Sequence, residues 1–97
     1  MAFSLNHDRL VINEEPVRVI FSSEPYVVTT FAGFSVAADV LAIKGRLKLE
    51  KTLLLGSKSL SDSLKPRIIE NNGNLIGVEL LIRKESSERT AKYLLED

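Results

Sequence analysis

RLKLEKTLLL, residues 46–55, and LIGVELLIRK, residues 75–84, decide the fold of this chain. Apolar and polar residues alternate in the first stretch, as in a strand with one buried face, and its last four residues are apolar on both sides. The second stretch alternates as well, with Gly77 at an expected bulge. Its predicted inner face consists of Ile76, Val78, Leu80 and Ile82.

A short helix is expected between these two strands. Ser57 or Ser59 can cap it by accepting a hydrogen bond from a free backbone N–H group. Leu60, Leu64 and Ile68 then share one face. Pro66 predicts a break, because an interior proline removes a hydrogen bond and costs about 3 kcal/mol. We therefore expect the helix to end near residue 64 or 65, or to restart at the proline, with Gly73 as a left-handed stop.

Residues 89–95 are expected to complete a hairpin with the strand before them. In this interpretation Ala91, Tyr93 and Leu95 point inward. A helix over 86–96 is the alternative, in which Glu88 and Lys92 form a favourable pair one turn apart.

Two further strands are predicted in the first half, over 17–21 and 26–31, on either side of the turn SSEP. Residues 34–43 (FSVAADVLAI) fit either a buried strand or a short helix. We favour the strand, because Lys44 and Gly45 lead directly into the next strand, as in a hairpin.

The element order predicts a mainly β fold: a small five-stranded OB-like barrel with one short helix. An α+β fold, an antiparallel sheet with one or two helices, is the alternative. Residues 51–96 resemble the second half of small phage-type and archaeal OB-fold proteins. The shared features are an apolar strand, a Ser/Leu helix, a glycine-containing strand ending in a basic residue, and a short strand with tyrosine. The resemblance implies binding of single-stranded nucleic acid or of protein.

Composition indicates one domain, residues 1–97, of an ordinary globular type. The chain has no cysteine, no signal-peptide pattern and no stretch apolar enough to cross a membrane, so we expect a cytoplasmic protein. No catalytic motif is present, and the one histidine, His7, lacks evident partners. We therefore expect no enzyme, cofactor or metal site.

The first functional hypothesis is binding of single-stranded DNA or RNA, because seven basic and two acidic residues lie between 44 and 67. Aromatic side chains on which bases could stack are few, and each of them also suits a core position. Phe21 and Tyr93 are expected in the core. The candidate binding residues are Lys44, Arg46, Lys48, Arg83, Arg89, Lys92, Tyr26, Phe31 and Phe34.

The second hypothesis is a non-enzymatic interaction protein, a homo-oligomer or an assembly subunit such as a small viral protein. The net charge is zero, and apolar residues occur on both faces of the predicted strands. These residues are Ile20, Leu54, Leu75, Leu81 and Leu94. One continuous basic groove would favour nucleic acid, whereas scattered charges around an apolar patch would favour protein.

Overall fold

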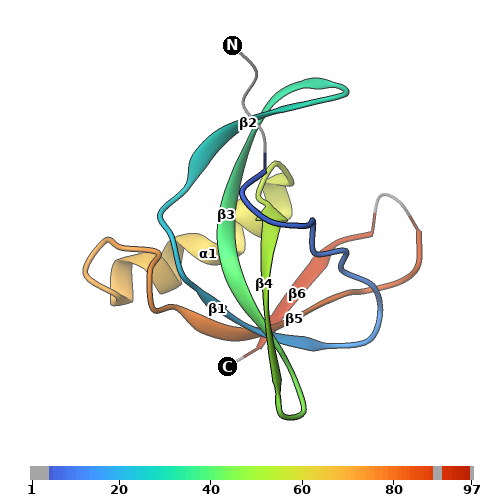
Figure 1. The fold of residues 1–97 in the computed structure, drawn as a ribbon, viewed down its shortest axis with the longest axis vertical. Helices are drawn as coiled ribbons and strands as arrows, with labels where there is room; N and C mark the ends of the chain where they lie inside the picture. The colour runs from blue at the N-terminus through green and yellow to red at the C-terminus, as the bar shows by residue number, and fades with distance from the viewer. Residues whose placement is uncertain (1–4, 89–90, 97) are drawn as a thin grey trace.

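The computed structural model describes residues 5–88 and 91–96. Its elements are β1 (Val17–Phe21), β2 (Tyr26–Thr30), β3 (Gly33–Lys44), β4 (Leu47–Leu54), α1 (Lys58–Glu70), β5 (Glu79–Lys84) and β6 (Tyr93–Glu96) (Figure 1). The predicted mainly β fold with one helix is confirmed.

The strands form one antiparallel six-stranded sheet around β3. β1 and β2 pair with β3 along one edge, and β4 pairs along the other. β5 then pairs with β1, and β6 with β5. Within the described residues the sheet does not close, because β4 and β6 are not paired. It also has six strands where five were predicted.

β1 and β2, predicted as two strands around a turn, are two parts of one interrupted edge along β3. Phe21 lies opposite Val40, and Tyr26 lies opposite Ala37. Residues 22–25 of the edge therefore face only residues 38 and 39 of β3. The interruption ends at Pro25, which has no backbone N–H to donate to the ladder. A two-residue step in register therefore separates the strands.

Residues 34–43 lie in β3, so the strand interpretation is confirmed and the helix alternative is wrong. The predicted β3–β4 hairpin also forms. Lys44 pairs with Leu47, and Gly45 takes a φ of +60° between them. A positive φ at the first of two turn residues is typical of a type II′ turn and favours glycine.

The helix runs without a break through Pro66, so the predicted end at 64 or 65 is wrong. Ser57 caps it through a 3.5 Å hydrogen bond from Leu60 N to its Oγ. Leu60 and Leu64 are buried, and Ile68 packs against the core. Burial of this face outweighs the loss of one backbone bond at the exposed proline. Beyond the helix, Gly73 takes a φ of +80°, as expected for a left-handed stop.

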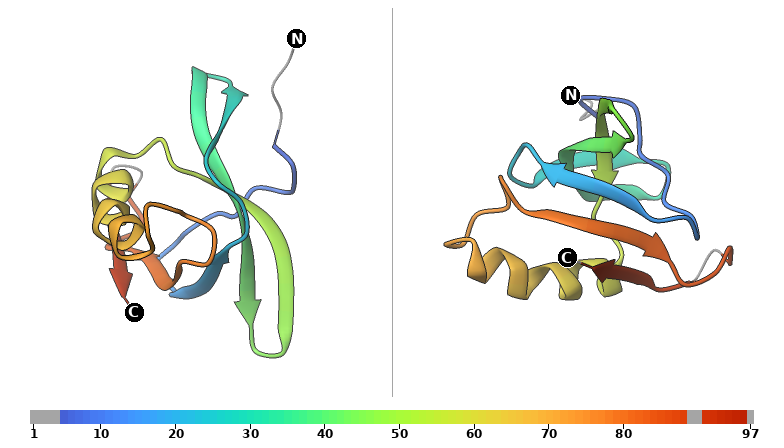
Figure 2. Two further views of the ribbon diagram at one scale, coloured as in Figure 1. Left: turned by 90° about the vertical axis from the view of Figure 1, so that its left-hand side faces the viewer. Right: turned by 90° about the horizontal axis from the view of Figure 1, so that it is seen from below.

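The core lies between the inner face of the sheet and α1 (Figure 2). Val78, Leu80 and Ile82 belong to it as predicted, but Ile76 is exposed and Leu75 is buried in its place. The reason is that β5 begins only at Glu79, so the alternation does not extend back through the loop. Tyr93 and Leu95 pack inward, and β6 is a strand rather than a helix. No helix in the described part of the chain is long and apolar enough to span a membrane.

Candidate protein-interaction surface

The basic residues proposed for nucleic acid do not form one groove. Lys44 and Lys48 lie on opposite faces of the β3–β4 hairpin, since Lys44 pairs with Leu47 and Lys48 pairs with Ile43. Arg46 lies in the turn between the strands rather than in β4. The hairpin therefore presents its cations in several directions.

The other basic candidates lie toward β5 and β6. Arg83 pairs with Leu94 on the outer face of the sheet, and Lys92 is exposed just before β6. Two strands, β3 and β1, separate Arg83 from Lys48 on that face. Arg89 lies outside the described residues.

The aromatic candidates lie at the other end of β3, in the β2–β3 hairpin. Phe31 lies in the turn and is fully exposed, at 112%, and Phe34 is 74% exposed. Tyr26 is half-buried at the start of β2. The twelve residues of β3 span roughly 35 Å, and its two hairpins lie at opposite ends of the molecule (Figure 1). The structure therefore does not bring Phe31 and Phe34 together with the cations at 44–48.

Apolar side chains dominate the exposed surface of the β2–β3 hairpin. Val27 pairs with Val36 on the same face as Phe34, and these two valines are 51% and 40% exposed. We call this the hairpin surface: Val27, Phe31, Phe34 and Val36. No lysine or arginine occurs between residues 19 and 43. Large exposed apolar patches of this kind mark interaction sites.

A polar network fixes the base of the hairpin on the opposite face. Asp39 Oδ1 accepts hydrogen bonds from the Tyr26 hydroxyl at 2.5 Å and from Thr52 Oγ1 at 3.0 Å. Asn6 Nδ2 donates to Asp39 Oδ2 at 2.9 Å. Burial opposes ionisation of Asp39, but these hydrogen bonds outweigh it and lower the pKa of Asp39. Burial, together with the bond to Asp39, raises the pKa of Tyr26.

His7 has partners in this network, contrary to the expectation from the sequence. Its Nε2 lies 4.0 Å from Asp39 Oδ2, and its Nδ1 lies 3.8 Å from Glu50 Oε2. The His7 backbone N–H donates to Thr52 Oγ1 at 3.0 Å. All three contacts anchor the N-terminal segment to β3 and β4, and we assign them a structural role.

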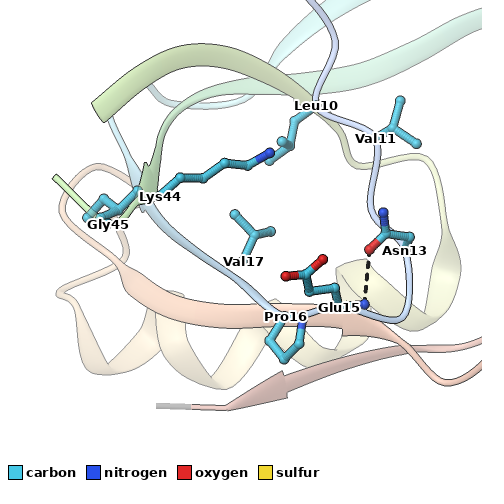
Figure 3. Close-up of a pocket in the computed structure, with 9 residues that line it drawn as sticks. Leu10, Val11, Asn13, Glu15, Pro16, Val17, Lys44 and Gly45 are labelled. Atoms are coloured by element: carbon cyan, nitrogen blue, oxygen red, sulfur yellow. Dashed lines mark hydrogen bonds between the residues drawn. The ribbon is translucent and has the colours of Figure 1, made fainter. Parts of the chain in front are cut away.

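Two open pockets flank the sheet. The first, about 400 Å³, lies between residues 10–17 and the end of β3 (Figure 3). Its charged side chains are Lys44, which extends across it toward Leu10, and Glu15, whose backbone N–H is bonded to Asn13 Oδ1.

The second pocket, about 380 Å³, lies between the hairpin and β6. Arg9, Phe31 and Tyr93 line it, and Lys84 Nζ lies 5.5 Å from the centre of the Tyr93 ring. Here, and not at residues 44–48, a cation meets exposed aromatic surface. Across residues 5–88 and 91–96, no group of three histidine or acidic residues is placed to hold a metal ion.

Comparison with protein-family models, with curated proteins and with solved structures finds no match to this chain.

Sequence reasoning missed Val27, Val36 and Asp39. Each had a signal in the sequence. Asp39 is the one carboxylate in an apolar strand, which indicates a buried hydrogen-bonded group. TTFAGF places phenylalanines around a turn, where polar residues are usual.

Proposed function

We propose that the protein is a non-enzymatic interaction protein that associates with further copies of itself, as a homo-oligomer or assembly subunit, through the hairpin surface. The observation that carries this proposal is the exposed pair Val27 and Val36 on one face with Phe34, next to the fully exposed turn residue Phe31, on a hairpin without basic residues. Leaving these side chains in water is unfavourable by roughly 25 cal/mol per Å² of apolar area. Association would remove that cost.

A second copy is the partner best suited to this surface. Two-fold association places one patch against the same patch, so the patch has to be compatible with itself. The side chains of the hairpin surface are uncharged, and the whole chain has thirteen basic and thirteen acidic residues. Neither local nor overall charge opposes the approach of two copies.

The test is sedimentation velocity and light scattering on the full chain between about 10 and 500 μM, because self-association depends on concentration. We expect the mass to rise from monomer toward dimer over this range. Phe31→Ser should weaken association at least about tenfold, which corresponds to about 1.4 kcal/mol.

Leu47→Ser is the matched control. Leu47 is 62% exposed, but it lies in the hairpin at the opposite end of β3. It should leave association unchanged. A strictly monomeric chain, or equal effects of the two substitutions, would refute the proposal.

Binding of single-stranded nucleic acid is the second candidate, and the pocket of Arg9, Phe31 and Tyr93 favours it. Bases can stack on aromatic rings while cations meet phosphates. The helix between β4 and β5, and the interrupted edge formed by β1 and β2, are compatible with an OB-like arrangement left open between β4 and β6. In this reading Lys84 and Arg9 act in place of Lys44, Arg46 and Lys48.

Fluorescence anisotropy with labelled oligo-dT, at about 50 and 200 mM salt, tests this candidate. Binding should weaken with salt, and Arg9→Ala or Lys84→Ala should reduce the salt dependence. Lys44→Ala, at the far end of β3, is the control and should bind as the unmodified chain does. Absence of binding at the lower salt concentration would remove this candidate.

A further inference from the structure

The outer edge of β2 carries backbone groups that point away from the sheet. On the other side of β3, Leu55 N donates to Val36 O at 2.7 Å, so the Val27–Val36 pair is not hydrogen-bonded. Antiparallel pairs alternate, and the backbone groups of Val27 and Thr29 therefore face outward. In residues 5–88 and 91–96, no backbone hydrogen bond is found on this edge.

The sequence of β2 itself, YVVTT, also lacks the charges and prolines that keep sheet edges apart. Natural edge strands are normally protected by charges, prolines, bulges or a covering segment. The outer edge of β4 has such a cover, since Thr52 N donates to Asp8 O at 2.9 Å and Leu10 N donates to Thr52 O at 2.8 Å. β6 is only four residues long and carries Glu96.

From this we infer that β2 pairs antiparallel with β2 of a second copy, in the register that places the two Val28 residues opposite each other. The inference rests on the proposed self-association and specifies its geometry. In this register Val27 of each copy faces Thr29 of the other. The outward N–H and C=O groups of both residues are therefore hydrogen-bonded in both copies. The two sheets become one continuous sheet with two-fold symmetry.

Neighbouring registers are poorer. Centring the pair on Val27 would set Thr29 against Pro25, which has no N–H to donate. Centring it on Thr29 would set Val27 against Phe31, which lies in the turn beyond the strand. Only the register centred on Val28 keeps every outward hydrogen bond within β2.

This register also brings exposed apolar side chains together. Phe31 of one copy falls beside Pro25 of the second copy. The neighbouring Glu24 carboxylate holds the backbone N–H of Ile76 at 2.9 Å, and Ile76 is 52% exposed. Phe31 follows one end of β2, and Ile76 is held by Glu24 just before the other end. Two-fold pairing therefore brings Phe31 of each copy to the end of β2 at which Ile76 of the other copy lies.

Thr29→Pro tests the pairing directly. It removes an outward N–H on an edge strand, where proline is tolerated, and leaves the inward bonds to β3 in place. We expect a loss of at least about tenfold in dimer affinity, measured by sedimentation equilibrium. The matched control, Thr29→Val, keeps the N–H group and the branched shape, and should dimerise as the unmodified chain does.

Cysteine cross-linking tests the register, because the chain has no cysteine of its own. In the inferred pair Val27 of one copy lies opposite Thr29 of the other, about 5.5 Å apart between Cα atoms and within disulfide reach. Val28 is buried, whereas Val27 and Thr29 are exposed, so a mixture of Val27→Cys and Thr29→Cys chains should form covalent heterodimers under mild oxidation. The two copies of residue 29 lie diagonally at about 7–8 Å, so Thr29→Cys alone should not cross-link.

The outcomes separate this inference from the proposed function. A monomeric chain at every concentration would refute both. A dimer that is weakened by Phe31→Ser but not by Thr29→Pro would keep the hairpin surface and overturn edge pairing. Cross-linking of Thr29→Cys chains with one another rather than with Val27→Cys chains would overturn the inferred register.

Discussion

The Tyr26 hydroxyl donates a 2.5 Å hydrogen bond to Asp39 Oδ1, joining the first residue of β2 to the middle of β3. The bond lies next to the interruption between β1 and β2, where Asp39 N also donates to Ser23 Oγ at 2.8 Å. Asp39 thus holds both sides of the register step. The orientation of the hairpin surface depends on this contact.

Tyr26→Phe should therefore destabilise the protein. The substitution keeps the ring but leaves the buried Asp39 carboxylate without one donor, and hydrogen bonds to charged groups contribute about 1.5–3 kcal/mol. We expect a loss of that order in the free energy of unfolding, measured in urea at neutral pH. Asn6 and Thr52 still donate to Asp39, so the fold should persist.

Tyr93→Phe is the control for this prediction. Its ring should keep its contacts with the core and with Lys84. A change of less than about 0.5 kcal/mol is expected, as for substitutions that remove no structural contact. Equal losses of unfolding free energy in the two variants would show that the Tyr26–Asp39 hydrogen bond contributes no more to stability than the Tyr93 hydroxyl does.

Alternation of apolar residues was sufficient to predict β4 and the inner face of β6, because strands with one buried face must alternate. The turn SSEP predicted β1 and β2 as separate strands, but nothing in the local pattern showed that both pair with the same side of β3 across a step in register. That step depends on Asp39 reaching Ser23 and Tyr26, and such contacts across 13 and 16 residues are not visible in a local pattern.

Protonation of Glu24 at low pH should weaken its hydrogen bonds with the backbone of Leu75 and Ile76. Its carboxylate accepts hydrogen bonds from Leu75 N at 3.0 Å and Ile76 N at 2.9 Å, and these bonds lower the pKa of Glu24. A lowered folded-state pKa stabilises the loop above the ordinary glutamate pKa, and this contribution is lost as pH falls through the folded value. In an NMR titration the Leu75 and Ile76 amide signals should shift together, with a midpoint below the ordinary glutamate pKa.

Glu24→Gln should abolish that shared titration, whereas Glu14→Gln, in the loop before β1, should leave it intact. A midpoint at or above the ordinary glutamate value would contradict the predicted direction. So would amide signals of Leu75 and Ile76 that titrate at different pH values.

Gly56 is predicted to be intolerant of a side chain because of Ser35. A Cβ at residue 56 would lie 2.6 Å from Ser35 Oγ, closer than real contacts allow. Gly56→Ala should lower the free energy of unfolding by about 1–3 kcal/mol, as other overpacked sites do. The measurement is thermal or urea unfolding of the purified variant.

A double-mutant cycle isolates the cause. Removing the hydroxyl in Ser35→Ala leaves Cβ at an ordinary 3.9 Å from the new methyl group. Gly56→Ala should then cost little in the Ser35→Ala background. An undiminished cost there would place the strain in the backbone rather than in this contact.

The candidate site was harder to predict than the fold. The run of cations at 44–48 is local in sequence, but alternation in β3 and β4 sends Lys44 and Lys48 to opposite faces. Phe31 and Phe34 were among the candidate aromatic residues for binding and both are exposed, but the sequence did not separate them from Tyr26, which is half-buried. Which end of a long strand leaves the core is set by its partners, and β1 covers only the second half of β3.

Pro66 provides the last prediction. It lies inside α1 and has no N–H to donate to Asp62 O, one turn earlier. Pro66→Ala restores that donor and improves helix propensity by about 3 kcal/mol, while a more flexible unfolded chain offsets about 1 kcal/mol. We expect a net gain of about 1–2 kcal/mol in urea unfolding. Lys65→Ala, an exposed neighbour that already has its N–H, should change stability by less than about 0.5 kcal/mol. A Pro66→Ala protein no more stable than the unmodified chain would mean that the exposed carbonyl of Asp62 is fully satisfied by water, and that the proline costs this helix nothing.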